Sequence, residues 1–314
     1  MIPIKRILFP TDYSRCSDDA LLRALWLAEL YRAELHIIHA LLPLDYDPWN
    51  AEHHLPDLAH IQQQIDALVP QKTGPDQPRR FETIPVKTAT VRGISPAPAI
   101  LTYAREHDIH FIVMGTHGRR GINHLMMGSV AEEVVRMSSC PVLTVRGTGE
   151  PLAPIKQILV PLDFSDFSCQ ALKAARWIAA DVGATIRALH VIEEVIHPSF
   201  YVTGQTSLSS WYPEIEANSV KEMQKLADKA GGPDVPLEFH VKEGRSAVDI
   251  VAFAKRNPIQ LIVMASHGLT GIDHFLLGSV TEKVVRLAPC PVLVIKSFGT
   301  SFITAIDTQT AEAR

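Results

Sequence analysis

The chain contains one pattern twice, and this repeat restricts the possible folds more than any other feature. Residues 4–14 (IKRILFPTDYS) return as residues 155–165 (IKQILVPLDFS), and residues 111–146 return as residues 261–296 with 19 of 36 positions identical. The repeat length is that of a whole domain, far above the roughly 20–50 residues of a solenoid unit. The sequence therefore predicts two copies of one domain. We place them at residues 1–146 and 155–296, with a linker at 147–154 and a C-terminal tail at 297–314.

Short apolar segments alternate with amphipathic ones in each copy. Apolar and β-branched runs predict strands at 4–10, 34–40, 81–92, 111–114 and 141–145, and in the second copy at 185–192, 237–243, 261–264 and 291–295. Apolar residues at helical spacing predict a helix after the first strand of each copy, and further helices at 100–106, 130–137, 248–256 and 280–287. This order, with its apolar central strands, predicts an α/β fold in which helices flank a parallel sheet.

A glycine-rich segment follows the fourth predicted strand of each copy. The spacing is G-x2-G-x9-G-S at Gly115, Gly118, Gly128 and Ser129, and the second copy has Ala265, Gly268, Gly278 and Ser279 at these positions. Glycines let backbone N–H groups approach an anion, and a helix N-terminus favours negative charge. The pattern predicts an anion site that is neither a Walker A loop nor GxGxxG. A structural interpretation stays open, because Ser129 with Glu132 and Ser279 with Glu282 have the spacing of capping boxes.

Three sequence marks together resemble the universal stress protein family. They are the P-x-D-x-S segments at 10–14 and 161–165, the glycine-rich loops, and the Cys-Pro-Val-Leu segment that closes each copy. The resemblance covers both copies and so implies a tandem member. For each copy it implies a five-stranded parallel sheet with helices on both faces, the fold of the adenine nucleotide alpha hydrolase-like proteins. Many family members bind ATP without a defined catalytic role, whereas others lack the loop and bind no nucleotide.

The resemblance also implies where ATP would bind. Asp12 would lie by the adenosine, the backbone of Ala40 would meet the adenine, and Met114 with Gly115 would flank the base and ribose. The loop residues up to Val130 would hold the phosphates. The full candidate set is Thr11, Asp12, Ala40, Met114, Gly115, Gly118, Arg119, Gly128, Ser129 and Val130, with Asp163, Val191, Met264, Ala265, Gly268, Gly278, Ser279 and Val280 in the second copy.

We expect the first copy to be the stronger ATP site. A methyl group at Ala265 would cost affinity if that position needs a positive φ or close approach of the ligand. Arg119 and Arg120 follow Gly118, where the second copy has Leu269 and Thr270. Two guanidinium groups would favour a triphosphate, although a solvated loop explains Arg120 equally well.

Other candidate residues have simpler explanations that stay open. Asp12 and Asp163 follow a proline and have the character of turn residues. His117 and His267 sit in the loops without an evident nucleophile, and His39 and His190 end the second strands as core or ligand-lining residues. Cys16 and Cys169 lie at helix starts, where a thiol pKa can be lowered. The long segments 41–59 and 195–213 are either lids or partner surfaces, or variable surface loops.

Composition excludes several functional classes. Lys and Arg number 30 against 34 Asp and Glu, a net charge of −4, which excludes a generally basic nucleic-acid-coating protein. No apolar run reaches the roughly 18–20 residues of a membrane span, and the pattern of the first residues leads us to expect no secretory signal. Four cysteines without a CxxC pair favour reduced thiols and a cytoplasmic location.

We therefore expect a cytoplasmic stress-response protein that binds ATP, with or without Mg²⁺, for regulation and not for turnover. The chain has no Walker lysine, no evident carboxylate cluster for Mg²⁺ and no activated nucleophile. The family pairs domains through the last strand, so segments 141–145 and 291–295 are candidate edges, and we expect a homodimer and a protein partner of unknown identity. The alternatives are an interaction protein of the same fold that binds no nucleotide, or a slow nucleotide hydrolase that uses His117 or Asp12.

Overall fold

The computed structural model describes residues 4–42, 63–64, 66–69, 83–116, 127–147, 153–193, 214–268 and 277–296. The chain divides into two compact units after residue 152. Most of segments 41–59 and 195–213, and all of the tail at 297–314, lie outside the described residues.

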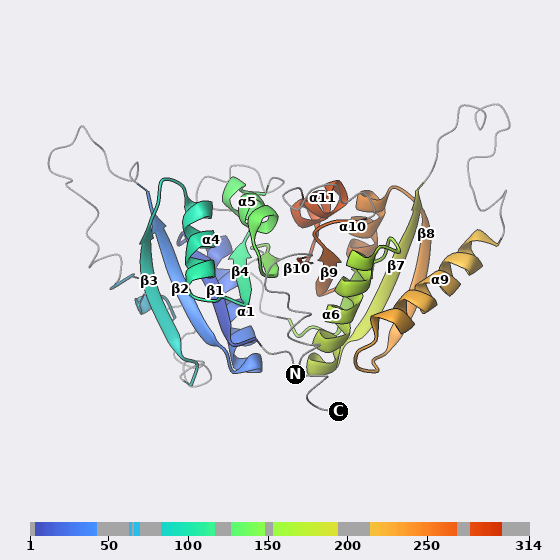
Figure 1. Ribbon diagram of the computed structural model, residues 1–314, viewed down its shortest axis with the longest axis horizontal. Coiled ribbons are helices and arrows are strands. Elements are labelled where there is room, and N and C mark those ends of the chain that lie inside the picture. The colour runs from blue at the N-terminus through green and yellow to red at the C-terminus, as the bar shows by residue number, and fades with distance from the viewer. Residues whose placement is uncertain are drawn as a thin grey trace. The chain divides into compact units, whose positions relative to one another are not determined.

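Each unit alternates strands and helices (Figure 1). The first contains β1 (Arg6–Thr11), α1 (Arg15–Tyr31), β2 (Glu34–Leu41), β3 (Val86–Arg92), α4 (Pro96–Glu106), β4 (Phe111–Gly115), α5 (Ser129–Met137) and β5 (Val142–Val145). The second contains β6 (Gln157–Pro161), α6 (Asp166–Val182), β7 (Thr185–Glu193), α9 (Ile215–Ala230), β8 (Leu237–Gly244), α10 (Ser246–Arg256), β9 (Leu261–Ala265), α11 (Ser279–Leu287) and β10 (Val292–Ile295).

The strands of each unit form a five-stranded parallel sheet, which confirms the predicted fold class. The order is β3-β2-β1-β4-β5 in the first domain and β8-β7-β6-β9-β10 in the second. The chain moves outward from β1 to β3, then returns to the other side of β1 for β4 and β5. Because crossovers between parallel strands are right-handed, this reversal places helices on both faces of the sheet. In the second domain α6 packs with α9, whereas α10 packs with α11.

The core lies around the central strands. Ile7, Leu8 and Phe9 of β1 are fully buried, as are Ile158 and Leu159 of β6. Continuous burial of this kind is typical of parallel strands covered on both faces. One predicted boundary is wrong: the third strand begins at Val86 and not at residue 81, because residues 83–85 form a turn that ends at Pro85.

Serine caps fix the start of the first helix in each domain. Ser14 and Ser165 are the N-cap residues of α1 and α6, and their side chains accept hydrogen bonds from the backbone N–H groups of Ser17 and Ser168. Each cap satisfies a donor that the helix itself leaves open. The P-x-D-x-S segment therefore ends in a helix cap directly beside the carboxyl end of β1 or β6.

Candidate nucleotide site

The reversal of strand order defines one edge of each sheet as the place for a ligand. In an open α/β sheet, chain connections leave in opposite directions at the reversal, and a crevice forms beyond the carboxyl ends of the two strands there. The reversal lies between β1 and β4 in the first domain and between β6 and β9 in the second. Thr11, Met114 and Gly115 end β1 and β4 at this edge, and Asp12 follows directly. Gly118 and Arg119 lie outside the described residues.

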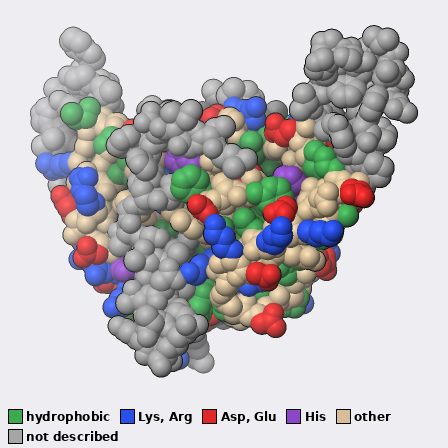
Figure 2. Space-filling model, turned by 45° about the vertical axis from the view of Figure 1, so that its right-hand side comes forward, with side chains coloured by type: hydrophobic (Ala, Val, Ile, Leu, Met, Phe, Trp, Pro, Cys, Tyr) green, Lys and Arg blue, Asp and Glu red, His purple; other side chains and the backbone are tan. Residues whose placement is uncertain are grey.

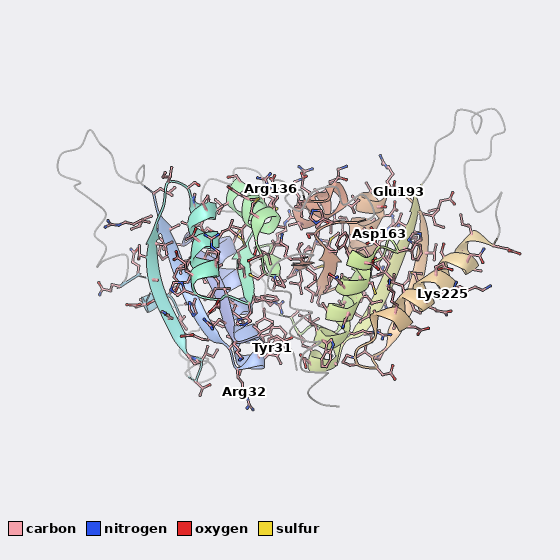
Figure 3. The ribbon with its side chains drawn as sticks, in the orientation of Figure 1. Tyr31, Arg32, Arg136, Asp163, Glu193 and Lys225 are labelled. Carbon is pink, nitrogen blue, oxygen red and sulfur yellow. The ribbon has the colours of Figure 1, made fainter. Side chains whose placement is uncertain are left out.

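The second domain shows the same edge with its loop glycine in place. Asp163 follows β6, and Glu193 ends β7 on the same side of the domain (Figure 3). A β-carbon added to Gly268 would overlap the Oδ2 atom of Asp163. The aspartate of the P-x-D-x-S segment and the loop glycine, 105 positions apart in the sequence, are therefore in direct contact. Glycine at position 268 is what permits this close approach.

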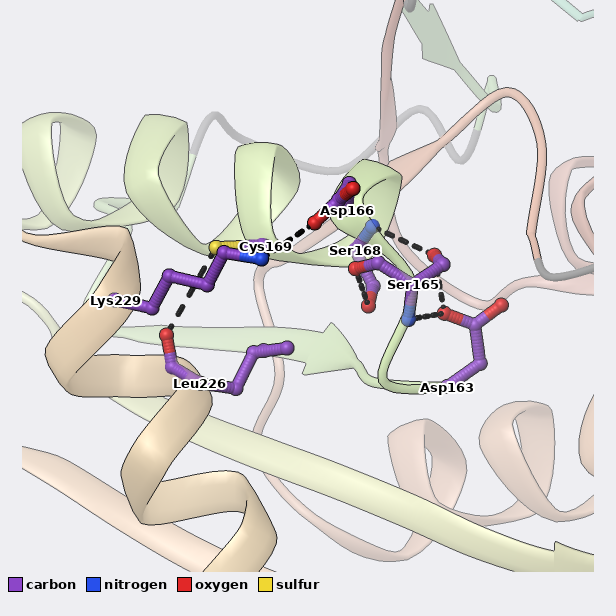
Figure 4. A network of polar contacts seen from close by, with 7 residues as sticks. All are labelled: Asp163, Ser165, Asp166, Ser168, Cys169, Leu226 and Lys229. Carbon is purple, nitrogen blue, oxygen red and sulfur yellow. Dashed lines mark hydrogen bonds and ion pairs between the residues drawn. The ribbon is translucent and has the colours of Figure 1, made fainter.

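Asp12 and Asp163 also stabilise the turns in which they lie, which is the simpler explanation that the sequence analysis left open. Asp163 Oδ1 accepts hydrogen bonds from the Ser165 backbone N–H at 3.1 Å and from the Ser165 hydroxyl at 2.6 Å (Figure 4). The Ser165 hydroxyl in turn accepts the N–H of Ser168 at 3.1 Å. In the first domain Asp12 Oδ1 accepts the N–H of Ser14 at 3.1 Å. One carboxylate oxygen of each aspartate thus holds the start of the following helix, and this fixes where the other oxygen lies.

The residue after each aspartate has an unusual backbone conformation. Tyr13 and Phe164 have φ of 61° and 65°, in the left-handed region that bulky side chains rarely adopt. Their rings lie against the imidazoles of His39 and His190, with centroids 4.8 Å and 4.3 Å apart. Sequence reasoning missed this pairing, although an aromatic residue and a histidine recur at matched positions of both copies.

The backbone at Ala40 and Val191 lies beyond the last paired residues of β1 and β6. The carbonyl of Leu189 accepts the N–H of Leu162 at 2.8 Å, just past the end of β6. Alternate residues of a strand point their backbone N–H and C=O groups toward the same neighbouring strand. The backbone groups of Val191 therefore point to the same side as those of Leu189, toward β6, but at a level where β6 has already ended. Ala40 is its counterpart in β2. A backbone donor and acceptor that lie past the end of the neighbouring strand suit the hydrogen-bonding edge of a planar base.

The capping-box interpretation of Ser129 and Ser279 is wrong. The N-cap residues of α5 and α11 are Gly128 and Gly278, and neither helix start has a side-chain cap. The serines occupy the first helical position, one residue too late for a capping box, and both are exposed. The first intrahelical bonds join Glu132 N–H to the Gly128 carbonyl and Glu282 N–H to the Gly278 carbonyl, at 3.0 and 2.9 Å.

The helix starts therefore offer backbone donors next to the strand ends. The N–H groups of residues 129–131 and 279–281 precede the first intrahelical bond and have no acceptor within the helix. Gly128 N–H donates to the Thr116 carbonyl at 2.7 Å, and Gly278 N–H donates to the Ser266 carbonyl at 2.8 Å. These bonds hold each helix start beside the end of β4 or β9. The arrangement suits an anion such as phosphate.

The expected reason for a glycine at position 115 is not observed. Gly115 has no left-handed φ, and a β-carbon there would lie 3.1 Å from the Cys16 carbonyl oxygen of α1. In the second domain Ala265 is accommodated, and its carbonyl accepts a hydrogen bond from Thr281 at 2.8 Å. The difference between Gly115 and Ala265 is therefore one of strand-to-helix packing. Met114 and Met264 are buried, each 5 % exposed, so their side chains belong to the core.

The cysteines near the site have no activated thiol. Burial raises the pKa of Cys16, although a hydrogen bond from the Gly147 backbone opposes this, and burial also raises the pKa of Cys169. The simpler interpretation of these two residues as partly buried thiols holds, because desolvation has the largest effect on both pKa values. All four cysteines are free, and Cys140 and Cys290 are buried as expected. Beside Cys169, Lys229 forms a 2.6 Å ion pair with Asp166 (Figure 4).

Charge and polarity give further limits. On the face shown in Figure 2, the described Lys, Arg, Asp and Glu side chains are intermixed. No group of three or more His, Cys, Asp or Glu side chains in the described ranges is arranged to hold a metal ion. Among the same residues, no helix is long and apolar enough to cross a membrane.

Together, these features define a duplicated, doubly wound α/β protein whose carboxyl sheet edges suit an anionic ligand with a planar base. The model of the universal stress protein family matches residues 3–146 and 154–296, so the chain belongs to this family as a tandem member. Universal stress protein MJ0531 of Methanocaldococcus jannaschii is 37 % identical over 142 residues, which cover 45 % of this chain and 82 % of that protein. A universal stress protein of Mycolicibacterium smegmatis is 27 % identical over 299 residues, covering 92 % of this chain and 96 % of that protein.

Solved structures share the fold over nearly the whole chain. Protein PA1789 of Pseudomonas aeruginosa, described as functionally unknown, superposes with a TM-score of 0.65 at 17 % identity and covers 98 % of each chain. A universal stress protein from Archaeoglobus fulgidus superposes with a TM-score of 0.63 at 21 % identity, covering 93 % of this chain and 98 % of that one.

Proposed function

We propose that this protein binds ATP at the carboxyl edge of each sheet and uses the binding for regulation in a cytoplasmic stress response. The observation that carries the proposal is the contact between Asp163 and Gly268 beside the uncapped start of α11. It supports the proposal because the aspartate, the loop glycine and the helix start, which are distant in the sequence, lie near one another at the sheet edge. The aspartate and the helix start suit different portions of ATP.

The assignment of these portions follows from the chemistry of the residues. The backbone of Ala40 or Val191 pairs with the adenine edge, because it offers a donor and an acceptor beyond the last paired strand residues. The carboxylate of Asp12 or Asp163 accepts hydrogen bonds from the ribose hydroxyls. The N–H groups of residues 129–131 or 279–281 receive phosphate oxygens, with Ser129 or Ser279 adding an exposed hydroxyl. A bound Mg²⁺ would be held mainly by the phosphates, as is usual for this ion.

The first domain is proposed as the stronger site, on one part of the sequence argument. Of the two reasons for which the Ala265 methyl group would cost affinity, the left-handed φ is not observed at position 115, and close approach of the ligand stays a prediction. One difference remains, because the Thr11 hydroxyl is buried and already bonded to Ser17 Oγ and the Tyr13 N–H. Arg119 and Arg120 stand where the second copy has Leu269 and Thr270. The extra cationic groups favour a triphosphate.

Regulatory binding is preferred to catalysis because the described residues offer no accessible nucleophile–base pair. Ser266 and His267 are within hydrogen-bond distance, with Oγ 3.0 Å from Nδ1, but they are only 1 % and 9 % exposed. A substrate phosphate has no access to a serine buried to this degree. Slow hydrolysis by a water molecule in the site is the remaining catalytic alternative.

Calorimetric titration of nucleotide-free protein with MgATP tests the proposal. We expect two sites per chain, the tighter one lost in Asp12→Asn and the weaker one lost in Asp163→Asn. Asparagine retains an acceptor for the Ser14 or Ser165 N–H, so the turn survives while the charge is removed. Asp228→Asn, on the exposed face of α9, is the matched control and should bind as the unsubstituted protein. Absence of ATP binding in the unsubstituted protein would establish the interaction-protein alternative instead.

A further inference from the structure

One histidine in each domain contacts the residue before and the residue after the candidate aspartate. His39 reaches across from β2, with Nδ1 2.8 Å from the carbonyl oxygen of Thr11 and its ring 4.8 Å from that of Tyr13. His190 repeats the arrangement from β7, with Nδ1 2.8 Å from the Leu162 carbonyl oxygen and its ring 4.3 Å from that of Phe164. Asp12 and Asp163 are the residues between.

The two copies differ around this contact but keep its form. The residue that supplies the carbonyl is Thr11 in one domain and Leu162 in the other, and the ring that lies tilted against the imidazole is that of Tyr13 or Phe164. The histidine and the aspartate are identical. The neighbouring side chains vary between the copies, whereas the bond to the backbone carbonyl and the ring contact recur. This indicates that the histidine acts on the backbone conformation of the residues on either side of the aspartate.

The hydrogen bond defines which ring nitrogen of the imidazole carries a hydrogen. A carbonyl oxygen can only accept, so Nδ1 carries the hydrogen and donates it. In the neutral ring Nε2 is then the unprotonated nitrogen. The hydrogen bond to the carbonyl therefore requires a donor at the Nδ1 position, and a polar side chain alone does not supply it. Variants that place a donor at the Nδ1 or the Nε2 position separate these two properties.

The backbone conformation of Tyr13 and Phe164 connects this contact to the carboxylate. The N–H of Ser14 meets Asp12 Oδ1 across Tyr13, and the N–H of Ser165 meets Asp163 Oδ1 across Phe164. The left-handed φ of the intervening aromatic residue therefore sets the carboxylate position. Such a conformation persists in a bulky residue only where its surroundings enforce it. The histidine supplies two of these enforcing contacts.

We propose that His39 and His190 are positioning residues of the nucleotide sites, which hold the ligand-facing aspartates through the hydrogen bond from Nδ1 to the preceding backbone carbonyl. This inference rests on the proposed ATP binding. It predicts that the donor at the Nδ1 position is required for affinity, and that the histidine itself does not touch the nucleotide.

Two matched double variants test the requirement. In the Asn pair (His39→Asn with His190→Asn) the amide NH₂ occupies the place of Nδ1, whereas in the Gln pair (His39→Gln with His190→Gln) it is one bond further out, nearer the place of Nε2. Both pairs lose the ring and remain polar. We expect calorimetry to show ATP affinity weakened about tenfold or more in the Gln pair and within about threefold of the unsubstituted protein in the Asn pair.

A second readout follows the backbone without nucleotide. The NMR backbone shifts of Tyr13 and Phe164 should leave the left-handed range in the Gln pair and stay in it in the Asn pair, and this comparison decides the question even where the Gln pair is too unstable for titration. His110→Gln is the control, because His110 lies at the opposite edge of the first sheet and the second domain already has Gln260 there.

The outcomes separate this inference from the function on which it rests. Failure of the unsubstituted protein to bind ATP would overturn the proposed function, and this inference with it, before any variant is made. Normal ATP binding with equal affinities and unchanged backbone shifts in both variant pairs would overturn the positioning role alone. Equal losses in both pairs would show that the ring contact, and not the hydrogen bond to the carbonyl, is what matters, and would also overturn the proposal.

Discussion

Gly268 and Asp163 lie so close together that a β-carbon at position 268 would overlap the carboxylate oxygen Oδ2. The contact connects the loop after β9 to the turn after β6 and forms the centre of the second candidate site. Because a glycine permits this approach and any other residue obstructs it, the pair can be tested as a unit.

Gly268→Ala should destabilise the second domain by about 0.5–1.5 kcal/mol, because the added methyl group pushes the Asp163 carboxylate away from its hydrogen bonds with Ser165. Urea unfolding measures this loss. In an Asp163→Ala background the space is vacant, so the same Gly268→Ala change should cost much less. Additive losses in the double variant would contradict the contact, since residues that do not touch behave independently.

Ser129→Ala should weaken ATP binding in the first domain without changing stability by more than about 0.5 kcal/mol, because Ser129 caps nothing. Ser165→Ala, which removes a real N-cap, should cost about 1 kcal/mol of stability. Chemical denaturation of both variants gives the comparison. A loss of stability in Ser129→Ala as large as that in Ser165→Ala would show that Ser129 is a cap after all.

Ala265→Gly should leave the ATP affinity of the second domain within about threefold of its original value, because position 115 in the first domain shows no left-handed backbone that a glycine must supply. Titration of this variant beside Gly115→Ala measures the effect in both directions. Gly115→Ala is expected to lower stability, since its methyl group would lie 3.1 Å from the Cys16 carbonyl oxygen. A large affinity gain in Ala265→Gly would restore the sequence argument for asymmetry.

The first domain should lose stability in mild acid. Burial holds the pKa of His36 and of His110 below the ordinary value of 6.5. His36 lies against Tyr103, Glu34, Lys87 and His107, and Arg6 and Lys5 further lower the pKa of His110 while Asp108 opposes them. Because the unfolded chain binds more protons at these sites, stability is complete above about pH 6.5 and is lost as the pH falls below it.

The duplication supplies a control for this acid effect. The positions of His36 and His110 are Arg187 and Gln260 in the second domain, and neither of these titrates in the same range. Hydrogen exchange at pH 7.5 and pH 5 should therefore show faster opening at low pH in β2 but not in β7. His110→Gln should reduce the difference, and equal acceleration in both strands would contradict the assignment to these histidines.

The fold and the edge that carries the candidate site followed from the sequence. Apolar runs such as 111–114 and 261–264, repeated at one offset, predicted the central strands because burial on both faces requires continuous apolar side chains. The helices and most strand limits were correct within a few residues. Residues 83–85 were wrongly included in a strand, since a strand pattern does not show where a turn at Pro85 ends.

Details of the candidate site depended on the tertiary structure. The spacing of Ser129 and Glu132 favoured a capping box, but the backbone at Gly128 takes the N-cap position, and spacing alone cannot distinguish neighbouring positions. His39 of β2 contacts Thr11 and Tyr13, the two neighbours of Asp12. No local sequence pattern predicts a contact between β2 and the turn after β1.

The sequence by itself thus determined the duplication, the α/β class and the family, because periodic burial and repeated motifs are properties of the chain order. Only the tertiary structure decided that Asp163 meets Gly268, that His39 and His190 hold the turns around the aspartates, and that Gly115 serves packing. These relations depend on interatomic distances between residues remote in the chain, and such distances are set when the strands pair and the helices pack on them.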